Sequence, residues 1–307
     1  KSSSKHQLPV KHDPINSDGK GQKTTATLSG DSGTSAVVET YGFVIPQYAS
    51  QRKLQPLDDL VSQFGAQYQL DAISPEMRQA MSYDGKLYGL PMQAQMYVLA
   101  YRKDVFDQLG LKPPTTFAEM RDSAAKIQQA GQIKYPIALP LLASADIVTA
   151  YDAALGSLGV DLVDHTTKTA NFTKPEARTA FDELRSLRPF MDPQVTTFDQ
   201  PRVQQQMYNG SAAMAIMFSG RMNDLTQASN SRFANAFGFA PPPSVQGGNT
   251  LYNALSVDGW SIPVNTKVDV TMPELKMAPV GERAKLVIAP DWDAINAHRD
   301  EWTKRWN

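Results

Sequence analysis

The stretch from Tyr83 to Ile127 reads YDGKLYGLPMQAQMYVLAYRKDVFDQLGLKPPTTFAEMRDSAAKI and carries an unbroken series of local structural signals. It opens with Asp84-Gly85, a pair that two-residue hairpin turns favour because glycine accepts a positive φ. Strand-forming residues flank this pair at Tyr83 and over Leu87–Leu90. A second apolar run over Met96–Tyr101 is expected to form the next strand. The stretch therefore begins as a hairpin that leads into a longer strand.

Two helices are predicted in the second half of the same stretch. Lys103–Leu109 has amphipathic spacing and is followed by Gly110, a residue that commonly ends helices. A rigid Pro-Pro-Thr-Thr turn then places Thr116 at a helix start, with Glu119 three residues later, which is the spacing of a capping box. We expect this second helix to cover Phe117–Gln129.

Outside this stretch, strands and helices are expected to alternate along the chain. Predicted strands cover Gln7–Ile15, Thr24–Leu28, Val37–Val44, Ile137–Leu142, Ser211–Phe218, Phe237–Pro243 and Leu255–Val264. Predicted helices cover Lys53–Leu60, Ala145–Leu158, Thr173–Leu187, Pro201–Asn209, Met222–Ala228 and Asp291–Trp306. This alternation indicates an α/β fold with mainly parallel sheets.

The composition excludes several classes of protein. The length of 307 residues fits one large or two medium domains. Thirty Lys and Arg residues stand against 31 Asp and Glu, a net charge of −1 that argues against a nucleic-acid partner. The longest apolar runs are far shorter than the roughly 20 residues that cross a bilayer. The chain has no cysteine and its four histidines are scattered, so we expect neither a metal site nor a bound cofactor.

The quoted stretch resembles the extracellular solute-binding proteins of carbohydrate-type ABC importers, the family 1 proteins related to maltose-binding protein. That family commonly shows D-G-K-x-Y-x-L-P, an apolar strand ending in Tyr-x-Lys-Asp, a helix, Gly-hydrophobe and Pro-x-T-aromatic. Three later pieces match in the same order: Phe172–Ala177 (FTKPEA), Met207–Ile216 (MYNGSAAMAI) and Ser256–Pro263 (SVDGWSIP). The last resembles the family's G-G-W strand, with Asp258 in place of the first glycine.

The resemblance implies an α/β periplasmic-binding-protein fold with two hinged lobes that are discontinuous in sequence. Residues 1–100 plus 255–280 would form the N-terminal lobe, and residues 101–254 plus 281–307 the C-terminal lobe. It also implies a non-enzymatic, exported, periplasmic monomer. This protein would capture a carbohydrate or polyol in the interlobe cleft and deliver it to the permease subunits of the ABC importer. A ligand can shift such a protein toward the closed form only through a higher affinity for that form.

The sequence departs from the family in two places. Members usually have some 60 or more residues between their first strand and the segment that matches Val37–Tyr41. They also carry an apolar helix after the strand that holds Trp260, whereas Asn265–Ala289 shows no such pattern. We expect residues of the family pattern to be missing near 15–36 and near 269–270.

Ligand-binding candidates in the N-terminal lobe combine an aromatic surface with planar polar groups, which suit the C–H faces and the hydroxyls of a sugar. The resemblance gives Trp260 a cleft-lining position, and Asp258 lies two residues earlier on the same strand face. Gln93 and Gln95 follow Leu90-Pro91 and offer amide donors and acceptors. Tyr41 lies in the Val37–Val44 segment, where the resemblance places a ligand-facing loop. Core packing for the aromatic residues, and a turn or ion pair for Asp258, remain open alternatives.

Further candidates lie in the other lobe. Ser219, Gly220 and Arg221 directly follow a buried strand, and the guanidinium could bind hydroxyls or a carboxylate. Asp146 and Tyr151 lie near the start of the Ala145–Leu158 helix, and Trp292 lies just inside the C-terminal helix. An interlobe ion pair for Arg221 and simple packing for the aromatic residues are the competing interpretations.

Two other functions remain open from the sequence. Arg221 could hold an anionic solute, such as a sugar acid or a glycerophosphodiester, in the same fold. A glycosidase would need a second carboxyl group about 5–10 Å from Asp258, and no spacing in the sequence identifies such a partner.

Overall fold

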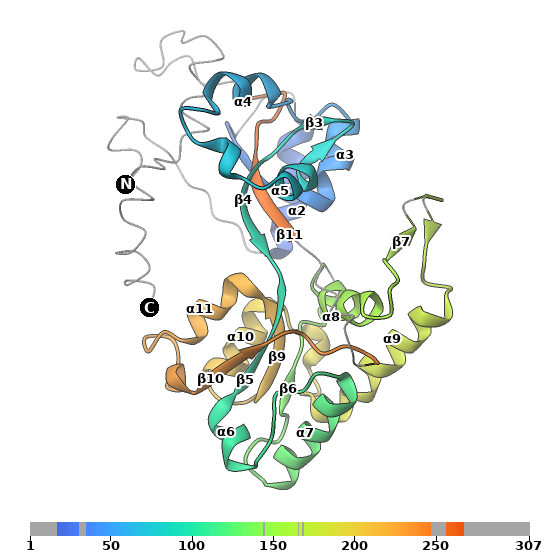
Figure 1. Cartoon of the computed structure of the whole chain (residues 1–307), viewed down its shortest axis with the longest axis vertical. Helices are drawn as coiled ribbons and strands as arrows, with labels where there is room; N and C mark the ends of the chain where they lie inside the picture. The colour runs from blue at the N-terminus through green and yellow to red at the C-terminus, as the bar shows by residue number, and fades with distance from the viewer. Residues whose placement is uncertain are drawn as a thin grey trace. The chain divides into compact units, whose positions relative to one another are not determined.

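The computed structural model describes residues 17–30, 35–143, 145–164, 166–167, 169–246 and 256–266. The chain folds into two compact units (Figure 1). Unit 1 contains the described residues of Lys1–Ala94 and Ser256–Arg305, and unit 2 contains those of Gln95–Leu255. Both units mix helices with sheet, so the α/β class expected from the sequence is confirmed. None of the described helices is both long and apolar enough to cross a membrane.

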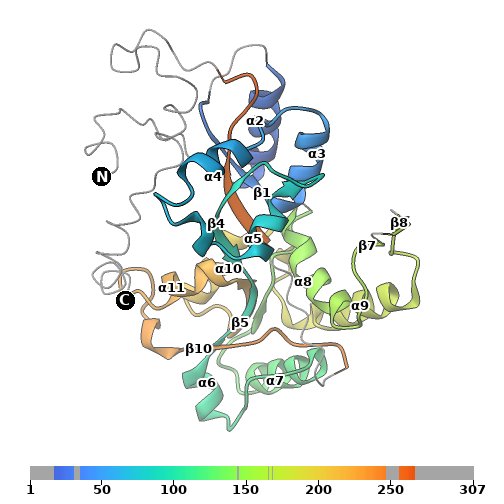
Figure 2. The ribbon, with the colours of Figure 1, turned by 45° about the horizontal axis from the view of Figure 1, so that its top comes forward.

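Unit 1 is built around a three-stranded sheet. Its helices are α2 (Ser17–Ser29), α3 (Ile45–Ser50), α4 (Asp58–Phe64) and α5 (Pro75–Ala80), and its strands are β1 (Val38–Tyr41), β2 (Ser82–Tyr83), β3 (Lys86–Leu87), β4 (Leu90–Gln95) and β11 (Ser256–Ser261). The strand order in the sheet is β1-β11-β4, and Figure 2 shows β1 and β4 on either side of β11. The core beneath it includes Ile45, Leu57, Met81 and Val257, all of them buried.

Unit 2 contains a four-stranded sheet with the order β10-β5-β9-β6. Its helices are α6 (Lys103–Gln108), α7 (Phe117–Gln129), α8 (Ala145–Gly156), α9 (Pro175–Ser186), α10 (Gln200–Tyr208) and α11 (Met222–Leu225), and its strands are β5 (Tyr97–Arg102), β6 (Ile137–Ala138), β7 (Val163–Asp164), β8 (Thr169–Ala170), β9 (Met214–Phe218) and β10 (Phe237–Ala240). Helix α10 packs on β9, and α8 packs along α9 (Figure 1).

The local signals of the stretch quoted first are confirmed by the structure. Strands β2 and β3 pair as a two-residue hairpin across Asp84 and Gly85, whose φ angles are 50° and 73°. Helix α7 covers the predicted range, and the Thr116 hydroxyl accepts a hydrogen bond from the Glu119 amide at 3.0 Å. Gly110 follows α6 with a φ of 63°. Each of these features depends on a few neighbouring residues, which explains why the sequence predicts them.

Two predicted elements in unit 1 are wrong. The β-branched run Thr24–Leu28 belongs to helix α2, not to a strand. The helix predicted over Lys53–Leu60 begins only at Asp58, because Leu54 forms a β-bridge with Pro263. In both cases a contact with a distant part of the chain decides the local structure. The predictions for Gln7–Ile15 and Asp291–Trp306 lie outside the described residues.

The prediction of mainly parallel sheets is also wrong. Strand β1 runs antiparallel to β11, and β5 runs antiparallel to both β9 and β10. Strands β6 and β9, in contrast, pair in parallel. Strand–helix alternation predicts parallel pairing when successive strands become neighbours, whereas the neighbours of β5 here come from chain segments more than a hundred residues later.

The apolar core of unit 2 encloses a carboxyl group on helix α8. Asp152 is only 7% exposed, and burial, followed by the negative charge of Asp161, raises its pKa to about 6. The hydroxyl of Tyr97 hydrogen-bonds to this carboxyl and opposes the shift. The folded-state pKa of Asp152 therefore lies above its ordinary value. The contribution of this carboxyl to folding stability is fully present below about pH 4 and is lost as the pH rises through 6.

We expect Asp152→Asn to stabilise the protein at neutral pH. The amide cannot ionise, so the variant avoids placing a charge in this core and should gain about 1–2 kcal/mol at pH 7.5. The gain should vanish below about pH 4, where the wild-type carboxyl is neutral. Urea unfolding between pH 4 and 8 measures it, with the exposed Asp122→Asn as the control. An equal difference at both ends of this range would contradict the assignment.

Candidate ligand-binding residues

One face of the unit 1 sheet gathers three of the sequence-predicted residues. In the antiparallel register of β1 and β11, Tyr41 lies opposite Asp258, and Glu39 lies opposite Trp260. Directly opposite residues of such a pair project from the same face of the sheet. The alternate positions are buried in the core and include Val38, Thr40, Val257 and Ser261. Burial of one face thus leaves Tyr41, Asp258, Trp260 and Glu39 together on the other.

Asp258 and Gln93 form a direct side-chain contact on this sheet. The Gln93 amide nitrogen on β4 donates a hydrogen bond of 2.7 Å to Oδ2 of Asp258 on β11. Asp258 is only 2% exposed, whereas Gln93 is exposed. The amide of Gln93 still has a carbonyl oxygen and a second N–H for other partners. The pair therefore offers adjacent donor and acceptor groups from two strands.

Aromatic surface lies beside this pair. The ring of Tyr41 stacks on that of Phe43, with centroids 5.3 Å apart and planes within 3°. Phe43 is 67% exposed, and Trp260 is half-buried. Sequence reasoning missed both Phe43 and Glu39. The period of two along β1 could have indicated Glu39, since Tyr41 follows it by two residues. We call Glu39, Tyr41, Phe43, Gln93, Asp258 and Trp260 cluster 1.

A second group of predicted residues comes together in unit 2, at the end of β9. The Ser219 amide donates to the Met96 carbonyl oxygen at 2.7 Å, and the Met96 amide donates to the Ser219 hydroxyl at 3.1 Å. A Cβ atom on Gly220 would lie 2.7 Å from Oε1 of Gln95. Only glycine therefore lets the Gln95 side chain lie this close to the turn. We call Gln95, Ser219, Gly220 and Arg221 cluster 2.

Arg221 is held by helix α10. Its Nη1 donates to Oε1 of Gln204 at 3.2 Å, and Nε2 of Gln204 donates to the Arg221 carbonyl oxygen at 3.2 Å. The same nitrogen of Gln204 lies 3.3 Å from a carboxylate oxygen of Asp224. Burial, with the charge of Asp224, raises the pKa of nearby Tyr208 to about 12, so this phenol stays neutral at ordinary pH. The neutral side-chain amide of Gln204 thus orients the Arg221 guanidinium.

The remaining predicted residues lie elsewhere in the chain. Tyr151 donates its hydroxyl to the Ala177 carbonyl oxygen at 3.2 Å, and its ring lies 6.2 Å from that of Phe172. Burial raises the pKa of the Tyr151 phenol. Asp146 belongs to the first turn of α8. Trp292 lies outside the described residues.

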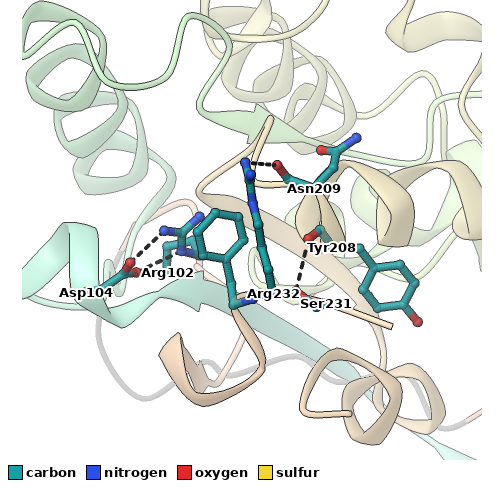
Figure 3. A network of polar contacts seen from close by, with 7 residues as sticks. Arg102, Asp104, Tyr208, Asn209, Ser231 and Arg232 are labelled. Atoms are coloured by element: carbon teal, nitrogen blue, oxygen red, sulfur yellow. Dashed lines mark hydrogen bonds and ion pairs between the residues drawn. The ribbon is translucent and has the colours of Figure 1, made fainter. Parts of the chain in front are cut away.

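A separate polar network holds β5 to the segment before β10 (Figure 3). Arg102 is buried and binds Asp104 through two hydrogen bonds, Nε to Oδ1 at 2.8 Å and Nη2 to Oδ2 at 2.6 Å. The Arg102 bond lowers the pKa of Asp104. The guanidinium carbon of Arg102 lies 3.5 Å from the centre of the Phe233 ring, and Arg232 also approaches this ring.

A hollow of about 440 Å³ adjoins this network, and its polar lining consists of Asp104, Ser231, Arg232 and Asn235. None of the residues predicted from the sequence lines it. Within the part of the chain that the structure describes, no group of three acidic or histidine residues could hold a metal ion.

The two clusters offer different groups. Cluster 1 combines carboxylates and an amide with aromatic rings, a combination that binds hydroxyl groups and C–H surfaces. Cluster 2 offers an amide, a hydroxyl and a guanidinium, which can exchange hydrogen bonds with hydroxyl groups. Cluster 1 carries two carboxylates, Glu39 and Asp258, on one sheet face, and such a face disfavours an anion.

Comparison with known proteins gives a family match. The sequence model described as bacterial extracellular solute-binding protein matches residues 10–269. A protein named as a binding protein in Brucella abortus (strain 2308) is 28% identical over 234 residues, which are 74% of this chain and 54% of the relative. The mannitol-binding protein of Pseudomonas aeruginosa is 36% identical over 88 residues, 28% of this chain and 19% of that protein. The chain spans about half the length of the first of these relatives, 54%.

Solved structures share the fold. An ABC transporter solute-binding protein from Agrobacterium vitis S4, solved with bound D-mannitol, matches with a TM-score of 0.80 at 24% identity, covering 98% of this chain and 70% of that one. Another from Agrobacterium radiobacter K84, in complex with ribitol, matches with a TM-score of 0.81 at 20% identity, covering 93% of this chain and 69% of that one.

Proposed function

The chain belongs to the bacterial extracellular solute-binding proteins, and from this premise we propose that it captures a sugar or polyol for an ABC importer. Members of this family bind solutes for transport and are not enzymes. We further propose that the protein works in the periplasm as a monomer and hands its ligand to permease subunits. The observation that carries the substrate class is cluster 1, in which a carboxylate–amide pair lies on the same sheet as Tyr41 and Trp260.

The relatives support a polyol as the first ligand to test. The Agrobacterium vitis protein holds D-mannitol, the Agrobacterium radiobacter protein holds ribitol, and a relative from Pseudomonas aeruginosa is named for mannitol. An open-chain polyol presents hydroxyl groups along its whole length, and each can donate to a carboxylate or exchange hydrogen bonds with an amide. We propose that Asp258 and Gln93 of cluster 1, and Gln95 and Ser219 of cluster 2, bind such hydroxyls.

An anionic solute is the alternative, and Arg221 is the residue that would bind it. Two observations favour the neutral ligand. The Arg221 guanidinium already donates a hydrogen bond to Gln204, whose own amide nitrogen bonds to Asp224. Cluster 1 also presents two carboxylates, whose charge would repel an anion. A glycosidase is not supported by the family, whose members are binding proteins.

Thermal unfolding with candidate ligands tests the proposal. At a concentration 100 times its Kd, a bound ligand adds about 2.7 kcal/mol to stability. We therefore expect D-mannitol or ribitol to raise the melting temperature by about 5 °C or more. Maltose, tagatose and sn-glycerol 3-phosphate complete the screen. Stabilisation by sn-glycerol 3-phosphate alone, abolished in Arg221→Gln, would replace the neutral ligand by an anion. No shift with any sugar or polyol would contradict the substrate class.

A further inference from the structure

The turn that carries Ser219, Gly220 and Arg221 is fixed to the first residues of β5. Tyr97 begins β5 and lies opposite Phe218, the last residue of β9, with their ring centroids 5.1 Å apart. Met96 directly precedes β5, and Ser219 directly follows β9. These two residues are joined by the two hydrogen bonds of 2.7 and 3.1 Å. The position of Tyr97 therefore determines where the turn lies.

Tyr97 is in turn anchored to helix α8. It is 5% exposed, and its hydroxyl hydrogen-bonds to the carboxyl of Asp152, which is 7% exposed. Among the described residues, the charged group that acts on Asp152 is Asp161, in the segment that follows α8. Helix α9, which packs on α8, carries the charged residues Glu176, Arg178, Asp182, Glu183 and Arg185. Of these, Arg178 and Asp182 are exposed and pair with each other at 2.7 Å.

We propose that Tyr97 and Asp152 are positioning residues for the ligand. The bond between their side chains fixes the start of β5 to α8, and through Met96 it holds the Ser219–Arg221 turn in the geometry that binds. This inference rests on the proposed function, because it assigns a role in the binding of the same ligand. Neither residue needs to touch the ligand for this role, since both are buried.

The bond couples ligand affinity to the ionisation of Asp152. Burial raises the pKa of Asp152 to about 6, so this carboxyl is mostly charged at pH 7.5 and mostly neutral at pH 5. A phenol donates a shorter and stronger hydrogen bond to a carboxylate than to a neutral acid. The turn is therefore held more firmly at the higher pH. By reciprocity, the ligand lowers the pKa of Asp152.

Calorimetric titration with D-mannitol at pH 7.5 and pH 5 tests the coupling. We expect the wild type to bind about fivefold more tightly at pH 7.5, the lower end of typical coupling between two sites. Tyr97→Phe has no donor and Asp152→Asn does not titrate, so both should lose this pH dependence. Asp152→Asn keeps an acceptor for Tyr97 and should retain more affinity than Asp152→Ala. Tyr101→Phe, on the same strand, is the control and should keep the wild-type profile. A Tyr97→Phe protein with the full pH dependence would overturn the proposal.

A ligand-free measurement separates this proposal from the choice of D-mannitol. Hydrogen exchange at pH 7.5 reports the two bonds between Met96 and Ser219 directly. We expect Tyr97→Phe to speed exchange of both amides about tenfold, while the amide of Ile216, in the middle of β9, stays protected. Unchanged exchange at Met96 and Ser219 would overturn the positioning role even if D-mannitol binds. Failure of the wild type to bind any polyol, with faster exchange in the variant, would instead count against the proposed function.

Discussion

Replacing Asp258 by alanine is expected to abolish ligand binding while leaving unit 1 folded. A carboxylate can accept hydrogen bonds from two hydroxyls of a polyol, and each bond to a charged group contributes about 1.5–3 kcal/mol. Loss of both should weaken D-mannitol binding by at least about 100-fold. The fold should tolerate the change, because Gln93, whose amide donates a hydrogen bond to Asp258, is exposed and its amide can turn to water.

Two variants make this result specific. Asp258→Asn keeps the volume and one acceptor, so we expect an intermediate loss of about tenfold. Asp84→Asn, in the exposed hairpin turn of the same unit, removes one negative charge outside cluster 1 and should bind like the wild type. Isothermal titration and the melting temperature with and without D-mannitol measure these outcomes. Normal affinity in Asp258→Ala would remove Asp258 from the site.

Local chemistry explains which elements the sequence predicts. The hairpin at Asp84-Gly85 and the helix that begins after Thr116 need only a few adjacent residues, and the structure contains both. The glycines after α6 and α10 have φ angles of 63° and 76°, as expected for residues that end helices. Each of these signals is complete within about four residues. Tertiary packing therefore has little opportunity to override them.

Helix α2 shows why other elements escape prediction. Its residues Thr24–Leu28 favour a strand by intrinsic preference. In the folded unit, the hydroxyls of Thr25 and Tyr48 lie 3.0 Å apart, and Leu28 is buried. The side-chain nitrogen of Asn265 donates to the Thr27 carbonyl oxygen at 2.9 Å, across 238 positions of sequence. Contacts of this range outweigh a weak local preference and leave no trace in a sequence window.

The candidate site follows the same division. The spacing of two between Asp258 and Trp260 predicts that they share a strand face, and the register of β11 against β1 places them opposite Tyr41 and Glu39, which are also two residues apart. The pairing of Glu39 with Trp260 could not be predicted, because the register of β1 against β11 depends on two segments more than 200 residues apart. The same holds for Gln204, which orients Arg221 from a different helix. Residue types and short spacings can thus be read from the sequence, whereas the partners that orient them cannot.

Replacing Gly210 by alanine is expected to destabilise unit 2 strongly. Gly210 has a φ of 76°, a conformation that strains residues with a side chain. A Cβ atom there would lie 2.4 Å from Cε2 of Phe233 and 3.0 Å from Nη1 of Arg102. The Phe233 ring would have to leave its position against the Arg102 guanidinium, whose carbon lies 3.5 Å from the ring centre. We expect a loss of about 3 kcal/mol or more in the free energy of unfolding.

The chain offers a matched control that separates strain from collision. Gly131 has a φ of 72°, but a Cβ atom there would meet no atom within 4 Å. Gly131→Ala therefore adds only backbone strain and should cost about 1 kcal/mol. The collision should disappear when the Phe233 ring is removed. In a Phe233→Ala protein, adding Gly210→Ala should therefore lower the free energy of unfolding by little more than Gly131→Ala lowers it in the wild type. Urea unfolding of Gly131→Ala, Gly210→Ala, Phe233→Ala and the double variant of the last two measures these losses. Equal losses for the two glycine variants in the wild-type background would show that Phe233 yields freely, and that the stack on buried Arg102 contributes little to the stability of unit 2.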